Sequence, residues 1–466
     1  MNKTIFSVYN SLLILFFSTS LAQELSSAEY VSTGSFGAAT INGKIYNQIS
    51  FRPEIRINKL GIGLDLNIYL DENGKIFSDN WNFTDTDVSF QSLMDKIYYV
   101  RWGSKNDDFY FRIGSLESVT LGHGALIDRY SNSIEYPQIK KLGINSIYTT
   151  GRIKFEYVQS NFKKTPALIA MQTSFALSST SNVFISFAHD MNQLTRLDEI
   201  FTNMNQDDFI EACDIIAESN EVDMGNTNCE AIFDTYKNDS PYNNKKDQIS
   251  GVSIGANHTL SKEFTLYTEW AKLLGESNGK ALGHGLILPG VSYRFKNGNI
   301  NVELRHVLSD NFLFSYWDKS YDIQRTIQRE QALPDLDDYY TKEQTLDTFK
   351  KMSGIFSYLS YDILNIMNFL VGYQSMGEDG YKSFSSSLNL NPNLIPKFKK
   401  VELFYQTNNE ENPFELSHGS VHGYNVGVEA SESMTIMFKS ITSYRYDVYG
   451  ALEPIRSMQL DTQFDF

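Results

Sequence analysis

The chain has almost no cysteine, little proline and, after its first 22 residues, no long apolar run. Only 2 of the 466 residues are cysteine and 10 are proline. A membrane-spanning helix needs about 20 predominantly apolar residues, so a helical inner-membrane protein is excluded. With two cysteines and no histidine beside them, a zinc site has little support.

The first 22 residues have the pattern of a secretory signal peptide. Lys3 is the positive n-region, residues 12–17 are an apolar core, and Ser20-Leu21-Ala22 is a small-x-small cleavage site. No cysteine follows that site, so a lipid-anchored lipoprotein is not expected. We therefore expect cleavage after residue 22 and one mature domain, 23–466.

Positive charge is in deficit, and the deficit is concentrated in one segment. The chain carries 40 basic and 56 acidic residues, and residues 191–247 alone hold 13 acidic against four basic ones. An acidic chain of this kind gives no sign of nucleic-acid binding. Cys213 and Cys229 lie in the same segment, and in an exported protein this favours a disulfide that pins a loop. Metal binding or free thiols remain the alternatives for these two residues.

Alternation of apolar and polar residues is the dominant pattern in the rest of the chain. Residues 60–70 place Leu60, Ile62 and Leu64 on one face and Gly63 and Asp65 on the other, and similar alternation recurs in 45–57, 262–274 and 299–308. Successive side chains of a strand point to opposite faces. The repeated charges on the polar face favour a wet interior, since an unpaired charge in a dry core is costly. We count about twenty such strands, or eighteen if one hairpin merges, each near ten residues long.

The final strand is the clearest one. Met458, Leu460, Thr462, Phe464 and Phe466 share one face, while Gln459, Asp461 and Gln463 share the other. With an export signal at the other end of the chain, this strand resembles the last strand of Gram-negative outer-membrane β-barrels. In those proteins the terminal Phe and the apolar residues before it are read by the assembly machinery. The resemblance implies a transmembrane antiparallel up-and-down β-barrel with Phe464 and Phe466 as the assembly signal.

The lengths of the connections agree with this fold. Bacterial barrels have both termini in the periplasm, short periplasmic turns and longer outer loops. The four longest predicted gaps are 72–94, 118–141, 191–247 and 311–349, and they follow the third, fifth, ninth and thirteenth strands. All four are odd-numbered strands, so all four gaps are expected at the outer end. Residues 321–333 are expected to form one amphipathic helix ended by Pro334.

Charged residues on the polar faces are the candidates for lining a pore. Rings of charge in a pore bias the passage of ions and polar solutes, although the same residues can pair with one another and simply fill a hydrated interior. The pore-lining candidates are Arg52, Glu54, Arg56, Arg112, Glu269, Arg294, Glu303 and Arg305.

A repeated Leu-Gly-His-Gly motif marks two further positions. It occurs around His123 and around His284, and both copies are followed by apolar residues. Flanking glycines allow a tight turn that exposes the imidazole. Both loops are therefore candidates for a pore constriction, and the alternatives are two similar turns or a paired-histidine metal site.

The function implied by the resemblance is a porin-like channel for passive diffusion of small polar solutes or ions. Such a barrel needs no cofactor or metal, and no set of nucleophile, base and orienting group suggests an enzyme. The expected partners are outer-membrane lipid, the barrel-assembly machinery and small polar solutes; a homotrimer is one possible assembly. The alternatives are a transporter of hydrophobic compounds, or a closed barrel that acts through its outer loops as adhesin, receptor or secretion-system subunit.

Overall fold

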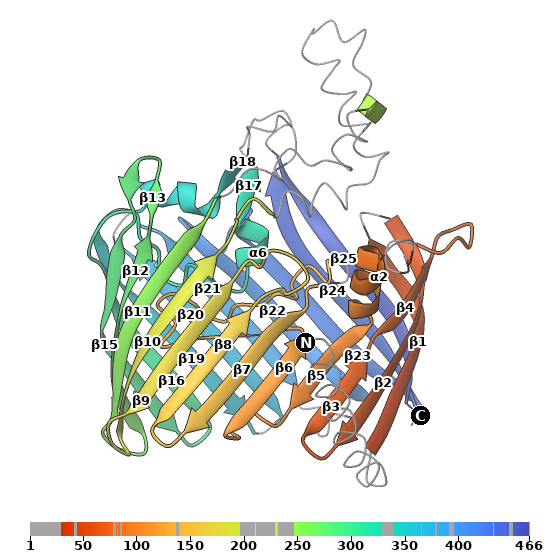
Figure 1. Ribbon diagram of the computed structural model, residues 1–466, viewed down its shortest axis with the longest axis horizontal. Coiled ribbons are helices and arrows are strands. Elements are labelled where there is room, and N and C mark those ends of the chain that lie inside the picture. The colour runs from red at the N-terminus through yellow and green to blue at the C-terminus, as the bar shows by residue number, and fades with distance from the viewer. Residues whose placement is uncertain are drawn as a thin grey trace, which may run out of the picture.

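The computed structural model is an all-β closed barrel with long loops at one end and short turns at the other (Figure 1). It describes residues 29–41, 44–77, 81, 83, 86–116, 118–136, 139–195, 210, 229–231, 247–328, 339–364, 366–377, 380–390, 396–431, 433–446 and 451–465. The predicted signal peptide, Phe466 and most of the acidic segment 191–247, including Cys213, lie outside the described residues. The predicted bridge to Cys229 therefore stays a prediction.

One antiparallel sheet of 21 named strands forms the wall. These strands are β1 (Glu29–Ile41), β2 (Lys44–Ile57), β3 (Leu60–Leu64), β4 (Leu66–Leu70), β5 (Ile97–Trp102), β6 (Phe109–Gly114), β7 (Gly143–Thr150), β8 (Ile153–Gln159), β9 (Ile169–Ala176), β10 (Ser181–Asp190), β11 (Ile249–Thr259), β12 (Phe264–Leu274), β15 (His284–Phe295), β16 (Gly298–Val307), β19 (Met352–Ile363), β20 (Met367–Met376), β21 (Lys382–Leu390), β22 (Phe398–Glu410), β23 (Val421–Ser431), β24 (Met434–Tyr446) and β25 (Leu452–Asp465).

The remaining elements belong to the loops. They are the hairpins β13 (Glu276–Ser277) with β14 (Lys280–Ala281) and β17 (Thr326–Gln328) with β18 (Tyr339–Thr341), and the helices α2 (Thr86–Met94), α6 (Tyr321–Gln324) and η3 (Lys342–Thr348). The helix expected over 321–333 is thus wrong at residues 325–328, and residues 329–333 lie outside the described part of the chain. The chain turns there into β17, which pairs with β18 and satisfies its backbone groups in a hairpin. Among the described residues no helix is long and apolar enough to cross a membrane.

The wall closes because the last strand pairs with the first, from Thr33 opposite Asp465 to Ala39 opposite Gln459. Strands β3 and β4 both pair with β2 and are two halves of one crossing, interrupted at Asp65. The barrel therefore has 20 crossings. The expected fold, an antiparallel β-barrel of 18–20 strands, is confirmed.

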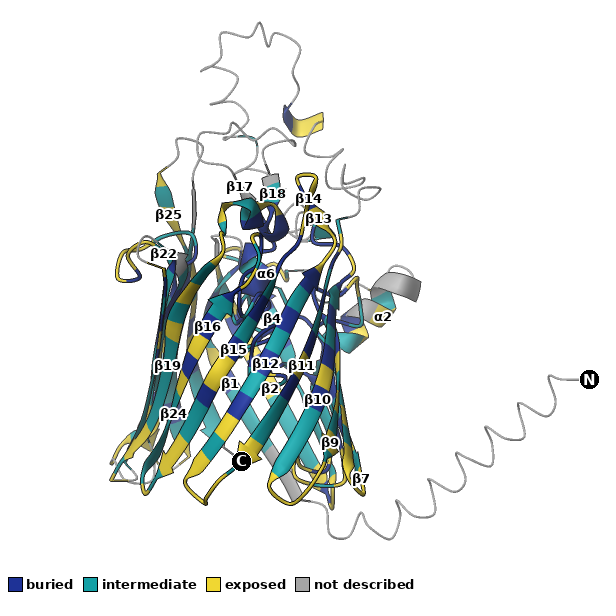
Figure 2. Cartoon of the chain, turned by 90° about the vertical axis from the view of Figure 1, so that its left-hand side faces the viewer, coloured by how far each residue is buried: buried dark blue, intermediate teal, exposed yellow. Residues whose placement is uncertain are grey.

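The two faces of the wall differ as the alternation predicted. Buried and partly exposed residues alternate along strands such as β12 (Figure 2). Large apolar side chains are exposed on the outside, among them Phe36, Ile49, Phe51, Ile185, Ile254, Val302, Leu304, Ile355, Leu403, Phe438 and Leu460. The inward positions hold many buried polar side chains, among them Gln48, Ser50, Asn67, Ser186, Gln374, Gln406 and Gln459. A polar interior inside an apolar outer band is the pattern of a barrel that stands in a lipid bilayer.

The 71–96 connection lies partly outside the barrel. Helix α2 projects from the wall (Figure 2), and its Phe90 and Leu93 side chains are exposed. Among the described strands β4 pairs only with β2, and part of this connection covers its other edge. The Trp81 indole donates to the carbonyl of Asn67 (2.6 Å) and the Phe77 amide donates to that of Tyr69 (2.8 Å). These backbone carbonyls on the open edge of β4 are thereby hydrogen-bonded without another strand.

Candidate functional site: a partition across the barrel

Two loops fold into the barrel and join each other there. They follow β6 and β16, and we call their described parts within 115–142 and 308–328 the partition. Ile127 and Trp317 form a parallel β-bridge, in which the Trp317 amide donates to the Leu126 carbonyl (3.0 Å). Ser315 adds a bond from its amide to the Ala125 carbonyl (2.9 Å). The two loops therefore behave as one folded unit inside the wall.

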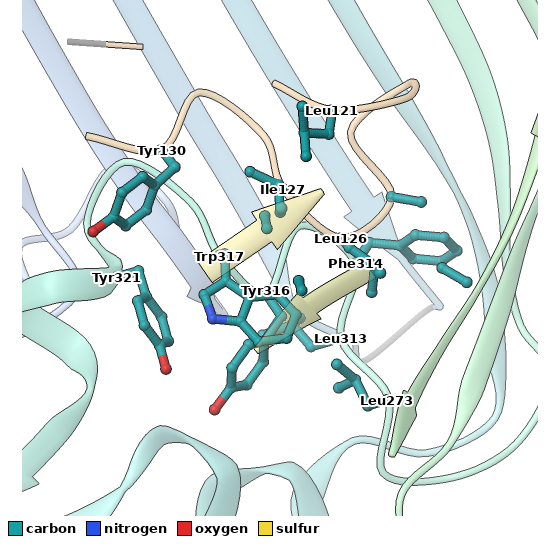
Figure 3. Close-up of a cluster of buried hydrophobic side chains, with 14 of the residues drawn as sticks. Leu121, Leu126, Ile127, Tyr130, Leu273, Leu313, Phe314, Tyr316, Trp317 and Tyr321 are labelled. Carbon is teal, nitrogen blue, oxygen red and sulfur yellow. The ribbon is translucent and has the colours of Figure 1, made fainter. Parts of the chain in front are cut away.

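An aromatic cluster holds the partition together (Figure 3). Tyr130, Tyr316, Trp317 and Tyr321 are all 0% exposed. The rings of Tyr316, Trp317 and Tyr321 contact one another, and Tyr316 and Trp317 meet edge to face with ring centroids 4.9 Å apart. Buried aromatic pairs of this geometry stabilise beyond their buried area, by about 0.5–1.5 kcal/mol each. The partition thus has a hydrophobic core of its own inside a polar lumen.

Hydrogen bonds fix the partition to the wall strands β9 and β12. The side chain of Gln172 accepts from the Gly122 amide (2.5 Å), and Glu269 accepts from the His123 amide (2.7 Å). Gly122 has φ +62° and Gly124 has φ +87°. These left-handed conformations favour glycine and turn the chain so that its amide groups face the wall.

An ion pair provides a further attachment on β10. The guanidinium nitrogens Nε and Nη2 of Arg325 donate to Asp190, at 2.9 Å each, and the Tyr321 hydroxyl donates to the same carboxylate at 2.7 Å. A second buried cation, Lys141, donates to Asp322 (2.7 Å) within the partition. Buried charges of this kind persist only when they are paired and hydrogen-bonded.

The partition also reaches strands on other parts of the circumference. Arg129 donates to Ser385 of β21 (3.0 Å), and Asn408 of β22 donates to Ser320 (2.8 Å). At a third place the Tyr136 hydroxyl donates to Asp65 (3.0 Å) and accepts from Arg52 of β2 (3.1 Å). The partition therefore spans the lumen and contacts the wall on several sides. Any solute that passes through the barrel has to pass it.

The eight pore-lining candidates lie at inward positions of their strands, on the face shared with Gln48, Asn145 and Asn301. Glu269 and Arg305 contact the partition from β12 and β16, and Glu303 pairs with Arg305. Glu269 holds the His123 loop, as described above. Arg305 pairs with Glu303 (2.7 Å), and its guanidinium lies 5.2 Å from the ring centroid of Phe314 in the partition.

The other five candidates have different surroundings. Arg52 pairs with Asp65 (2.7 Å) and donates to the Tyr136 hydroxyl of the partition (3.1 Å). Arg56 pairs with Glu54 (2.9 Å). Arg112 lies 5.1 Å from the ring centroid of Tyr99, and Arg294 lies at the exposed inner end of β15. The eight residues do not form one ring of charge, and their part in solute passage stays a prediction.

The two Gly-His-Gly motifs are not brought together. His123 lies in the partition, where its ring stacks on Tyr267 with centroids 4.1 Å apart. His284 begins β15 at an outward position, and its ring lies 5.9 Å from that of Trp270, also on the outer face. A constriction or metal site built from both histidines is therefore not what the geometry supports. Among the described residues no group of three or more metal-ligating side chains occurs.

Sequence reasoning missed the residues that fasten the partition. Asp190, Arg325, Tyr136 and Lys141 are scattered charges and hydroxyls in loops or at a strand end, with no periodic signal. The sequence offers one hint, the aromatic group Phe314, Tyr316 and Trp317, for which a structural role is the favoured interpretation and contact with a ligand or lipid is the alternative. The structure places these side chains in the core of the partition.

The closed wall, the apolar outer band and the inward-folded loops define a porin-like transmembrane β-barrel. No model of a known protein family matches the chain, and no curated protein matches it significantly. Among solved structures it is similar to Pseudomonas aeruginosa OccK11 (OpdR), with 9% identity over 94% of this chain and 95% of that chain and a TM-score of 0.34. The copper transporter OprC matches with 7% identity over 94% and 81% and a TM-score of 0.37. A mutant of the Rh. blastica porin matches with 7% identity over 94% and 100% and a TM-score of 0.23.

Proposed function

We propose that the protein is a channel of the Gram-negative outer membrane through which small polar solutes diffuse passively. The observation that carries the proposal is the polar inner face of a closed barrel whose outer face is apolar. A wall of this kind supports a hydrated path through lipid. The proposal includes export by the predicted signal peptide and insertion by the barrel-assembly machinery, with Phe464 on β25 as part of the assembly signal.

In this function the partition is the size-selecting element. It is a folded unit with its own core and is attached to several strands, so its outline stays fixed while solutes pass beside it. The charges of the inward faces, including Arg52, Glu54 and Arg56, then bias which solutes approach it. No energy source is needed, because diffusion follows the concentration gradient.

A liposome-swelling assay tests the proposal. Proteoliposomes loaded with an impermeant dextran are diluted into isosmotic arabinose, glucose, sucrose or raffinose, and swelling reports entry of the sugar. We expect swelling that slows as the sugar becomes larger. Protein-free liposomes and liposomes with heat-denatured protein are the controls. No swelling with any sugar, from protein shown to be folded by its heat-modifiable migration on gels, would contradict the proposal.

A closed barrel is the second candidate, and one observation favours it: the partition contacts strands on several sides of the lumen, through Arg129, Asn408 and Tyr136. Such a barrel would act through its outer loops as adhesin, receptor or secretion-system subunit, and it would give no swelling. A transporter of hydrophobic compounds is less well supported, because the described inward face of the wall is mainly polar.

A further inference from the structure

A cavity of about 300 Å³ lies inside the barrel beneath the partition. The Gly122–His123 turn of the partition forms one side of it, and inward positions of β7 to β11 form the others. Gly151 and Arg152, which also line it, belong to the β7–β8 turn at the end opposite the long loops (Figure 1). The cavity therefore faces the inner end of the barrel.

The charged side chains that line this cavity are cationic. Arg152 and Lys154 both contribute, and no carboxylate is among the lining residues. Lys154 lies 3.5 Å from Glu156, yet its side chain remains 43% exposed. Arg152 makes no ion pair within the described part of the chain. Two carboxylates lie behind this lining: Glu156 beside Lys154, and Glu269, which accepts from the His123 amide. The charged groups that face the cavity itself are the two cations.

Neutral hydrogen-bonding groups complete the lining. Thr149, Ser174, Asn182 and Asn257 present hydroxyl and amide groups, and the Asn182 side-chain amide donates to Oδ1 of Asn257 (3.3 Å). A hydrogen bond from such a donor to a charged acceptor is roughly twice as strong as one to a neutral acceptor. Phe184 adds an apolar surface, which suits the carbon body of a small organic molecule.

The side of the cavity formed by the partition is preorganised. The His123 ring packs edge to face on Phe184 (5.4 Å between centroids) and is stacked on Tyr267. The preceding Gly122 amide is held by Gln172, as described above. Little ordering is therefore required when a ligand enters, and preorganisation of this kind favours affinity.

We propose that this cavity is a binding subsite for a small organic oxyanion, a carboxylate or a phosphate monoester, held by Arg152, Lys154 and the neighbouring amides. This proposal rests on the proposed function, because the subsite requires a barrel that spans the membrane and has a hydrated inner end. A solute anion that has passed the partition would be retained there before release.

Ligand binding by the folded full chain in detergent tests this subsite. Saturation-transfer NMR is recorded with butyrate, its neutral analogue butyramide and its cationic analogue butylammonium, and methyl phosphate is then added as competitor. We expect saturable binding of butyrate and little binding of either analogue. Stronger displacement by methyl phosphate than by an equal amount of acetate identifies a phosphate monoester as the better ligand, and the reverse identifies a carboxylate.

Variants decide whether the cavity is responsible. The double variant R152Q/K154Q is expected to weaken butyrate binding about tenfold or more, since charge-assisted hydrogen bonds are lost. Lys296→Gln, an exposed cation in the β15–β16 turn outside the cavity, is the matched control and is expected to bind as the wild type does. If the double variant does not fold, Arg152→Gln alone is expected to weaken binding several-fold.

Equal binding of the three four-carbon probes, or unchanged butyrate binding in R152Q/K154Q, would overturn the subsite. Binding does not require conduction, so the two proposals fail separately. If the protein admits sugars but binds no butyrate, the channel proposal is supported and the subsite proposal is contradicted. If the protein binds butyrate in this cavity but admits no sugar, the subsite proposal is supported and the channel proposal is contradicted.

Discussion

Arg325 and Asp190 join the partition to the barrel wall through two parallel hydrogen bonds of 2.9 Å. Their side chains are 1% and 0% exposed. Nothing in the sequence places them together, since 135 positions separate them. A bidentate pair fixes both distance and orientation, so this contact sets where the second loop enters the lumen.

Removing the cation from this pair is expected to destabilise the protein strongly. In Arg325→Met, Asp190 keeps its charge in a buried site, and breaking a buried pair in this way costs about 3–5 kcal/mol. The combined variant R325M/D190N is the matched control, because it removes both charges and keeps an acceptor for the Tyr321 hydroxyl. We expect it to recover part of the loss, as measured by urea unfolding of the barrel followed by heat-modifiable migration. A double variant no more stable than the single one would contradict this account of the contact.

Trp317 is expected to control the size of the passage. Trp317→Ala leaves a cavity in the core of the partition and costs about 3–5 kcal/mol if the site does not collapse. A loosened partition should admit larger sugars in the swelling assay and should give larger and noisier single-channel currents. Phe36→Ala, on the outer face of β1 where the side chain is 58% exposed, is the control and should leave both unchanged. Equal sugar cut-offs in the two variants would show that the partition does not limit the passage.

Docking of the η3 segment is expected to weaken as the pH rises. Burial, together with the neighbouring Asp247, raises the pKa of Glu343 to about 8. The folded protein therefore holds a proton that the unfolded chain has already lost, and its stability falls as the pH rises from about 4.5 to about 8. Glu343→Gln should flatten this decline, measured as the unfolding temperature at pH 5 and pH 9, while Asp347→Asn on the same helix should keep it. An identical pH profile for wild type and Glu343→Gln would count against this role.

The strands of the wall could be predicted from the sequence, but the contacts of the partition could not. Alternation decides which face of a strand each side chain lies on. The period of two was enough to place Leu60 and Ile62 on one face and Gly63 and Asp65 on the other. The same rule put Glu303 and Arg305 inside. It does not say which groups meet them there, and Phe314 reaches Arg305 only because a loop of irregular backbone folds inward.

Loop contacts escape such reasoning because no period governs them. The repeated Gly-His-Gly motif predicted equivalent roles for His123 and His284, yet one lies in the partition and the other begins a strand. The difference lies in the pairing of the next residues along the chain: those after His123 pair with the other loop, and those after His284 pair with β12 and β16. Tertiary partners, and not the local motif, decide which of the two enters the lumen.

Single-channel recording in a planar lipid bilayer tests the central claim most directly. Folded wild-type protein is added to one side, and current is measured first in symmetric salt and then across a salt gradient. We predict discrete ohmic conductance steps, with a reversal potential that shifts toward cation preference in R152Q/K154Q. A silent bilayer, from protein that migrates as a folded barrel and is shown to be inserted, would contradict the claim that this barrel is an open channel.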